Sequence, residues 1–229
     1  MGSRFLIGLA LLVAAASAAA DTIAIIGTGD VARALGPEFA AQGHTIVYGS
    51  RDPGSQKARN LVAATGKDAS VTTQAASVED ADIIVLAVPG MLVREITTGL
   101  GDLAGKIIID PTNPLKREAL AFRHAVDTSN AEIIQAAAPE AYVVKAFNTL
   151  NWKTMIDPES SGGPVSIPLA GDNRSAKSKV AELVAGMGLE PVDVGGVENA
   201  HWVEGMLILW INNRYGARDS FEYHLRKTR

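Results

Sequence analysis

The strongest constraint on the fold is an apolar run that leads directly into a glycine-rich turn near the start of the chain. Residues 23–32 read Ile-Ala-Ile-Ile-Gly-Thr-Gly-Asp-Val-Ala, a β-type segment followed by the pattern G-x-G-x-x-A. In a βαβ unit, the first glycine (Gly27) allows a sharp turn and the second (Gly29) leaves room for a pyrophosphate. Ala32 then lets the following helix pack closely on the strand, and the helix N-terminus offers N–H groups to phosphates. The pattern therefore predicts a dinucleotide-binding unit.

The residues that follow the turn favour the same unit. Leu35, Phe39 and Ala40 recur at helical spacing, and Gly43 is a typical helix end. Residues 44–48 then form a second apolar strand. A glycine-rich turn alone often only connects a strand to a helix, but this context on both sides indicates a dinucleotide site.

The end of the second strand indicates which dinucleotide is bound. An enzyme for NAD usually carries Asp or Glu about 20 residues beyond the glycines, where the carboxylate accepts from the ribose 2′-hydroxyl. This chain has Ser50 and Arg51 there, and Asp52 follows one residue later, before Pro53. A serine hydroxyl and a guanidinium can both donate to a 2′-phosphate. The pattern favours NADP over NAD; the alternative is an arginine in a solvated loop.

Composition narrows the class of protein. The chain has 229 residues, of which 47% are hydrophobic and 20% charged, as expected for a globular α/β domain with a smaller addition. The net charge of −4 lacks the basic footprint of a nucleic-acid-binding protein, so no nucleic-acid partner is expected. The absence of cysteine excludes disulfides, thiolate catalysis and cysteine-ligated metal sites, and no histidine cluster has metal-binding spacing.

Residues 1–20 have the pattern of a secretory signal peptide. Arg4 supplies a positive charge, residues 5–14 are apolar, and Ala18-Ala19-Ala20 provides the small residues of a cleavage site. The apolar stretch is short and rich in alanine, so no stable membrane span is expected. Cleavage would make Asp21 the mature N-terminus and place the protein in the periplasm or outside the cell. The alternatives are a misassigned start codon, with a cytoplasmic protein, or an uncleaved membrane anchor.

Strands and helices alternate over residues 21–150, which predicts a Rossmann-type doubly wound parallel sheet. Beyond the first two strands, apolar runs predict further strands at 81–88, 106–110 and 141–147, and residues 70–73 are a short strand candidate. Helical patterns lie between them at 56–64, 75–78, 93–100, 118–125 and 131–137. Residues 151–229 are expected to form a smaller C-terminal α/β unit, with strands at 165–170 and 190–194 and helices at 174–187 and 198–212.

Ligands bind beyond the carboxyl ends of the strands in an open parallel sheet. Four such ends are distinctive: the glycine turn, residues 87–90, residues 110–114 and residues 145–149. The candidate cofactor-binding residues all lie at these ends or directly after the second strand: Gly27, Thr28, Gly29, Asp30, Val31, Ser50, Arg51, Ala87, Val88, Pro89, Asn113 and Asn148.

No side chain is identified as a general acid or base. His44 is typical of a turn, His124 and His224 are interpreted as surface helix residues, and His201 at the start of the last helix suits capping or packing better than a cleft. Asp110 at a strand end is expected to orient a loop. No catalytic residue is assigned on this basis, and hydride transfer between two stacked cofactor rings depends more on proximity and orientation than on a proton relay.

Five segments resemble those of the NADP-dependent deazaflavin oxidoreductase family, the NADPH-dependent coenzyme F420 reductases. They are Ile25-Ile26-Gly27-Thr28-Gly29, Gly49-Ser50-Arg51, Ala87-Val88-Pro89, Asp110-Pro111-Thr112-Asn113-Pro114 and Val144-Lys145-Ala146-Phe147-Asn148-Thr149. The Gly-Ser-Arg segment is also similar to the cytosolic NADPH domain of the six-transmembrane ferric reductases. The tail Phe221-Glu222-Tyr223-His224-Leu225-Arg226 resembles that of bacterial dinucleotide-binding members.

This resemblance implies that Thr28, Ser50 and Arg51 hold the NADP phosphates and that Val88, Pro89 and Asn148 lie near the nicotinamide. It implies hydride transfer between NADPH and a cofactor-like acceptor, a deazaflavin (coenzyme F420) or a flavin, in a homodimer. Asn148 stands where the archaeal deazaflavin enzymes look to have histidine, so both acceptors stay open. Two alternatives are a reductase of a small imine or ketone, similar to pyrroline-carboxylate reductases, and a non-catalytic NADP-binding sensor.

Overall fold

The computed structural model describes residues 20–66, 68–216 and 219–228. The predicted signal peptide therefore lies outside the described residues, apart from its last alanine.

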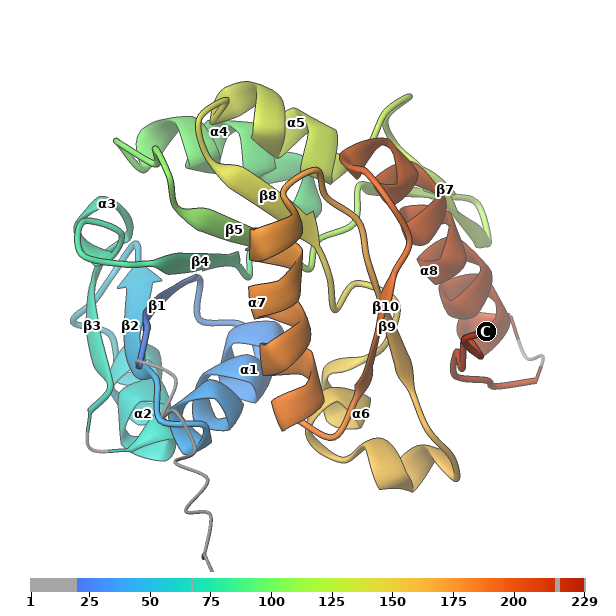
Figure 1. Ribbon diagram of the computed structural model, residues 1–229, viewed down its shortest axis with the longest axis horizontal. Helices are drawn as coiled ribbons and strands as arrows, with labels where there is room; N and C mark the ends of the chain where they lie inside the picture. Colours follow the sequence, from blue (N-terminus) through green and yellow to red (C-terminus); the bar gives the residue numbers. More distant parts are fainter. Residues whose placement is uncertain (1–19, 67, 217–218, 229) are drawn as a thin grey trace, which may run out of the picture.

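A six-stranded sheet forms the centre of the molecule, and all of its strands are parallel (Figure 1). The strand order is β3-β2-β1-β4-β5-β8. The bounds are β1 (Thr22–Ile26), β2 (Thr45–Ser50), β3 (Ser70–Thr73), β4 (Ile83–Leu86), β5 (Ile107–Asp110) and β8 (Tyr142–Lys145). This order confirms the predicted doubly wound sheet, with β1 and β4 at the point where the chain reverses its direction across the sheet.

Helices cover both faces of this sheet. In Figure 1, α1 (Asp30–Ala41) and α2 (Gln56–Thr65) lie below it, while α4 (Val93–Gly99) and α5 (Asn130–Ala137) lie above, and the short α3 (Gln74–Ser77) follows β3. Alternate residues of β1 belong to two separate hydrophobic cores, one on each face of the sheet. Ile23 and Ile25 pack with α1 in one core, and Ala24 and Ile26 pack with α4 and α5 in the other. Burial on both faces explains why the strands are continuous apolar runs.

The C-terminal part adds a second, two-stranded sheet. The elements of this part are α6 (Trp152–Ile156), β9 (Ser166–Leu169), α7 (Arg174–Gly186), β10 (Glu190–Asp193) and α8 (Ala200–Tyr215), with 3-10 turns at Pro158–Ser161 and Val197–Asn199. A further 3-10 turn, Gly90–Leu92, follows β4. β9 and β10 pair in parallel, and Lys145 forms an antiparallel bridge with Ala170. Val144 and Val180 belong to one hydrophobic core, which therefore includes residues on both sides of position 150. A domain boundary at 150 stays a prediction.

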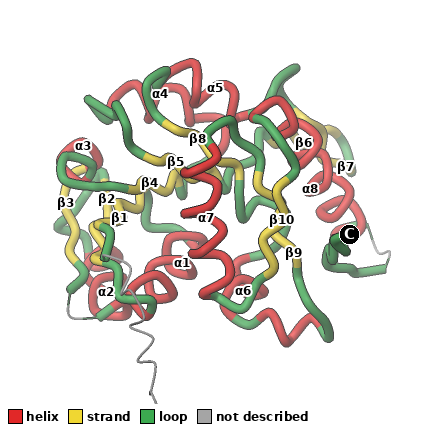
Figure 2. Tube along the Cα trace, in the orientation of Figure 1, coloured by secondary structure: helices red, strands yellow, loops and turns green. Residues whose placement is uncertain are grey.

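The helix predicted at residues 118–125 is wrong, because the chain forms an antiparallel hairpin of β6 (Leu115–Glu118) and β7 (Ala121–His124). The segment contains good helix formers, so local propensity favours a helix. Tertiary contact decides otherwise: the Asn212 side chain of α8 accepts from Phe122 N at 2.7 Å and donates to Phe122 O at 3.0 Å. The hairpin lies beside α8 (Figure 2). The sequence patterns also missed α6.

The C-terminal tail returns to the second sheet. Ser166 N donates to Tyr223 O at 2.9 Å, and Leu225 N donates to Ser166 Oγ at 2.8 Å, so the tail lies along β9. His224 is exposed and contacts Glu190 from this tail, so its predicted helical setting is wrong. Within residues 20–66, 68–216 and 219–228, no helix combines the length and the apolar character needed to cross a membrane.

His44 makes stability depend on pH. Its Nδ1 lies 3.1 Å from both Asp21 N and Asp21 Oδ2; an unprotonated nitrogen accepts from the N–H, and a protonated one would donate to the carboxylate. Burial lowers the pKa of His44 below its ordinary value of 6.5; the Asp21 carboxylate opposes this shift and Lys179 adds to it. Because the folded pKa is depressed, the unfolded state binds more protons than the folded state between the folded pKa and pH 6.5. The free energy of unfolding therefore decreases as the pH falls from 6.5 through the folded pKa.

We expect His44→Gln to make the melting temperature less dependent on pH over this acidic range. Thermal unfolding at a series of pH values measures the effect. The matched control is His224→Gln, which changes an exposed histidine. If the melting temperature of the His44→Gln protein depended on pH as strongly as that of the wild-type protein, His44 would not be the group responsible.

Candidate functional site

A pocket of about 550 Å³ lies at the carboxyl ends of β1, β2 and β4. It brings together residues 27–29, 49–52 and 87–89, and its other lining residues are Ser55, Lys57, Gln74, Leu92, Glu95 and Ile96. The position beside the reversal of strand order is where open α/β sheets bind ligands. Most of the predicted cofactor-binding residues line this pocket; Asp30, Val31, Asn113 and Asn148 are not among its lining residues.

The two glycines of the turn serve different purposes. Gly27 has a φ of +117°, and a Cβ atom there would overlap the carbonyl oxygen of Ala87. The overlap and the φ require glycine here, and the Gly27 N–H donates to Gly49 O at 2.9 Å, which links the turn to the end of β2. Gly29 has an ordinary φ of −84°, and a Cβ atom there would meet nothing within 4 Å. Packing therefore does not require glycine at position 29, and its bare backbone leaves the N-terminus of α1 accessible.

Hydrogen-bond donors gather at the end of β2. Ser50 is buried, and its Oγ accepts from Asp52 N at 3.1 Å, which leaves the hydroxyl proton free to donate. Arg51 is exposed at the pocket and makes no side-chain hydrogen bond or ion pair with any residue that the structure describes. Lys57 also lines the pocket, from the first turn of α2. The pocket therefore holds one hydroxyl and two cations beside the N-terminus of α2, groups that suit an anion.

Lys57 and Ser55 were missed by the sequence analysis. Ser55 is the N-cap of α2, where its Oγ accepts from Ala58 N at 3.3 Å. The signal in the sequence is a Pro-Gly-Ser turn that opens a helix, with a basic residue in the first helical turn.

Asn113 and Asn148 join two strand ends beside the pocket. Asn148 Nδ2 donates to Asn113 Oδ1 at 3.0 Å, and Asn113 Nδ2 donates to Asn148 O at 3.1 Å. The preceding residue, Phe147, has a φ of +63° and packs on Phe39 with ring centroids 6.2 Å apart. A left-handed conformation in a bulky residue costs on the order of 1–3 kcal/mol. The packing of the Phe147 ring therefore stabilises a strained backbone at Phe147, which sets the position of Asn148.

A buried charged cluster lies below these strand ends, and the sequence analysis missed it. Lys145 Nζ contacts Asp110 Oδ2 at 2.7 Å and Glu204 Oε1 at 2.6 Å, and all three side chains are fully buried. Asp110 Oδ1 accepts from both the N–H and the hydroxyl of Thr112, which confirms its predicted role in orienting a loop. Burial raises the pKa of the Glu204 carboxyl, and the Lys145 ammonium opposes this shift.

His124 belongs to this cluster, so its assignment as a surface helix residue is wrong. It lies in β7, its side chain is 15% exposed, and its Nε2 is 2.7 Å from Glu204 Oε2. Glu204 comes from α8, which is far away in the sequence. Only the tertiary structure pairs the two residues. His201 Nδ1 faces Thr128 O at 2.8 Å, in agreement with a packing role.

Comparison with known proteins identifies the family. Residues 22–114 match the family model described as NADP oxidoreductase coenzyme F420-dependent. The F420-dependent NADP reductase of Methanothermobacter marburgensis is 30% identical over 209 residues, which cover 83% of this chain and 91% of that protein. This chain belongs to the coenzyme F420-dependent NADP oxidoreductase family.

Two further relatives agree with this membership. A crystal structure of a candidate F420-dependent NADP reductase from Arthrobacter sp. FB24 has a TM-score of 0.81 and 31% identity, and the match covers 90% of this chain and 100% of that one. Rat metalloreductase STEAP3 is 34% identical over 188 residues, or 82% of this chain and 36% of the relative. The chain spans about a third of the length of the metalloreductases that it matches.

Two observations indicate that the residues of this oxidoreductase fit NADP. The backbone at Gly29 leaves open a space that a side chain would enter, as a pyrophosphate site requires. Arg51 and Lys57 bring two cations to the same pocket as the Ser50 hydroxyl, as a 2′-phosphate requires. NADP, when bound, supplies the hydride chemistry, and the chain supplies binding and orientation.

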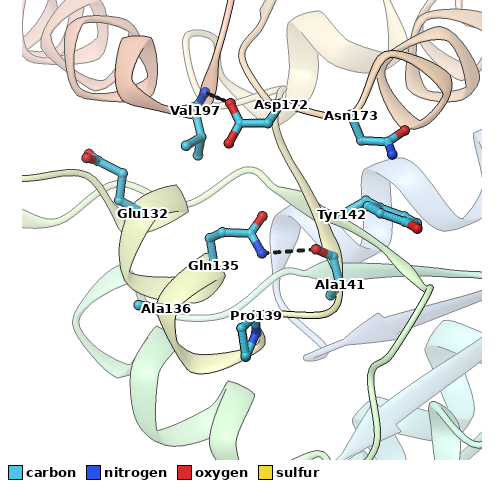
Figure 3. Close-up of a pocket in the computed structure, with 9 residues that line it drawn as sticks. All are labelled: Glu132, Gln135, Ala136, Pro139, Ala141, Tyr142, Asp172, Asn173 and Val197. Atoms are coloured by element: carbon cyan, nitrogen blue, oxygen red, sulfur yellow. Dashed lines mark hydrogen bonds between the residues drawn. The ribbon is translucent and has the colours of Figure 1, made fainter.

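A second pocket of about 620 Å³ lies beside the first residue of β8, at the amino edge of the sheet (Figure 3). Gln135 Nε2 donates to Ala141 O at 2.9 Å, and Asp172 Oδ1 accepts from Val197 N at 2.9 Å. These polar groups fix local backbone. The second pocket contains none of the predicted site residues of the oxidoreductase.

Proposed function

We propose that this chain transfers a hydride between NADPH and a planar acceptor, a deazaflavin such as coenzyme F420 or a flavin. The observation that carries the proposal is the group of hydrogen-bond donors Ser50, Arg51 and Lys57, which line the same pocket as the open backbone of Gly29. The relative named F420-dependent NADP reductase, which this chain matches over most of its length, supports a deazaflavin acceptor.

The roles of the site residues follow from their positions. Thr28, Asp30 and Val31 belong to the loop and first turn of α1, where the backbone N–H groups would face the pyrophosphate. Ser50, Arg51 and Lys57 would bind the 2′-phosphate. Residues 87–89 would lie along the nicotinamide half, and the Asn113–Asn148 bridge would border it. No group is assigned as a proton donor to the acceptor.

NADPH oxidation with added coenzyme F420 or FMN, followed by absorbance, tests the proposal. We expect turnover with at least one of the two. A third arm adds a ferric chelate together with FMN, because several relatives are named metalloreductases. Tight NADPH binding without turnover of any acceptor would instead favour a sensor, and turnover of a cyclic imine alone would favour an imine reductase.

We also propose that the first 20 residues are a signal peptide and that the mature chain begins at Asp21 outside the cytoplasm. The apolar segment followed by three alanines supports this. N-terminal sequencing of a periplasmic fraction tests it, and an intact N-terminus in the cytoplasmic fraction would contradict it.

A homodimer is proposed from the family resemblance. The mass in solution, measured by light scattering on the purified mature chain, decides between one and two copies. A monomer over the whole working range of concentrations would contradict the proposal.

A further inference from the structure

The Glu204 carboxylate contacts residues that hold the loops at the carboxyl edge of the sheet. It projects from α8, its side chain is fully buried, and Oε1 lies 2.6 Å from Lys145 Nζ. The same oxygen accepts from Asn130 N at 2.9 Å. Lys145 and Asn130 each continue the network toward loops that border the nicotinamide half of the proposed site.

Lys145 and Asn130 hold two of these loops. Lys145 Nζ donates to Thr112 O at 2.6 Å, and Asn130 Nδ2 donates to Thr112 Oγ1 at 2.7 Å, which fixes the loop after β5. Asn130 Nδ2 also donates to Gly90 O at 3.0 Å, which fixes the loop after β4. A Cβ atom at Gly90 would overlap Asn113 O, so the two loops are in direct contact.

The loop after β8 is held from the same part of α8. Asn148 Nδ2 donates to Val203 O at 3.2 Å, and Val203 directly precedes Glu204. Three strand-end loops therefore take their position from one turn of α8. The proposed 2′-phosphate site is built from residues 50–57 and takes no hydrogen bond from this network.

The second oxygen of Glu204 shares one proton with His124. His124 Nδ1 is 2.6 Å from Val126 O, and a carbonyl oxygen can only accept, so Nδ1 carries a proton. Nε2 lies 2.7 Å from Glu204 Oε2, and this contact needs one more proton, either on the ring or on the carboxyl. The other ionisable groups that face the pair are Lys145, Asp110 and His201, whose ring centroid is 4.6 Å from that of His124.

We propose that Glu204 is a positioning residue for the nicotinamide half of the site, and that the proton it shares with His124 keeps it in place. This inference rests on the proposed function for its effect on turnover. When that proton is released to solvent, a carboxylate oxygen and an imidazole lone pair face each other at hydrogen-bond distance and repel. Glu204 then shifts relative to Lys145 and Asn130, and the loops at Gly90 and Thr112 lose their common support.

As the pH rises and the shared proton is lost, two properties of the wild-type protein should therefore decline together. One is kcat, by about tenfold to a hundredfold, as expected for misplaced reacting groups. The other is the change in nicotinamide fluorescence when NADPH binds. The dissociation constant of NADPH should change by less than about twofold, because the phosphate contacts contribute most of the binding and are formed elsewhere.

Glu204→Gln and His124→Gln both remove the dependence on pH while keeping a contact. In Glu204→Gln, the amide N–H donates to the neutral His124 ring, and in His124→Gln, the amide N–H donates to the Glu204 carboxylate. Neither contact loses a proton as the pH rises, so kcat and bound-NADPH fluorescence should stay flat over the range in which the wild-type protein declines. Glu198→Gln is the matched control, because it makes the same change at an exposed glutamate just before α8. His124 is partly accessible, so its variant tests the inference even where Glu204→Gln fails to fold.

The inference would be overturned if the wild-type protein showed no decline with rising pH, or if both variants showed the same decline as the wild-type protein. The fluorescence readout needs no acceptor. A wild-type protein that turns over no acceptor, yet shows a fluorescence decline that both variants remove, would therefore contradict the proposed function and support the role of Glu204.

Discussion

Replacing Arg51 with alanine is expected to weaken NADPH binding by roughly tenfold to a hundredfold, as for the loss of a hydrogen bond to a charged group. NADH binding should change by less than about twofold, because NADH lacks the 2′-phosphate that Arg51 would contact. Titration of each cofactor by fluorescence gives both constants. The exposed Arg51 side chain has no partner among the described residues, so its removal should leave the melting temperature unchanged.

Arg59→Ala is the matched control for this experiment. Arg59 is also an exposed arginine, but its guanidinium donates to Gly54 O and Gln56 Oε1 within α2 and its N-terminal turn, and it does not line the pocket. Lys57→Ala should lower NADPH affinity in the same direction as Arg51→Ala and by less, because an ammonium cannot form the two-pronged contact of a guanidinium. Equal losses for NADPH and NADH would contradict the placement of the 2′-phosphate.

Replacing each of the two glycines of the turn with alanine should have different effects, one on stability and the other on cofactor binding. Gly27→Ala is expected to lower the free energy of unfolding by about 3 kcal/mol or more, because the left-handed backbone and the overlap with Ala87 O both oppose a side chain. Gly29→Ala has an ordinary backbone and open space around its Cβ, so the melting temperature should barely change. Its methyl group should nevertheless weaken NADPH and NADH equally, by about tenfold, because both carry the pyrophosphate.

Chemical denaturation and cofactor titration on both variants measure the two effects. Each glycine variant is the control for the other, since both add one methyl group to the same turn. A Gly29→Ala protein that binds NADPH as tightly as the wild type would contradict the pyrophosphate site at the start of α1. A Gly27→Ala protein of wild-type stability would contradict the steric role of Gly27.

The parts of the fold that were predicted correctly depend on local signals. β1 and β4 are apolar runs because each strand is buried on both faces, and this pattern is visible in a window of a few residues. The glycine turn follows from backbone conformation at Gly27. The assignment of Ser50 and Arg51 to the 2′-phosphate stays a prediction; it depends on their position at the carboxyl end of β2, where ligands of open parallel sheets bind.

The features that were missed depend on partners distant in the sequence. Residues 115–124 form a hairpin rather than a helix because Asn212 pairs with the backbone of Phe122, about 90 residues away. His124 has the local setting of a surface residue, and Glu204 that of an ordinary residue of an apolar helix. No pattern around either residue shows that they share a proton, because the contact exists only once α8 packs against β7.

The sequence by itself determined that this chain has a doubly wound sheet and an NADP-type strand end, because periodicity, turn chemistry and residue type at a strand terminus act over short range. The tertiary structure alone decided how the strand-end loops are held. Lys145, Asp110 and Glu204 lie on three separate elements, and each buried charge would be strongly destabilising without its partners. The partners are brought together by packing, which no short segment encodes.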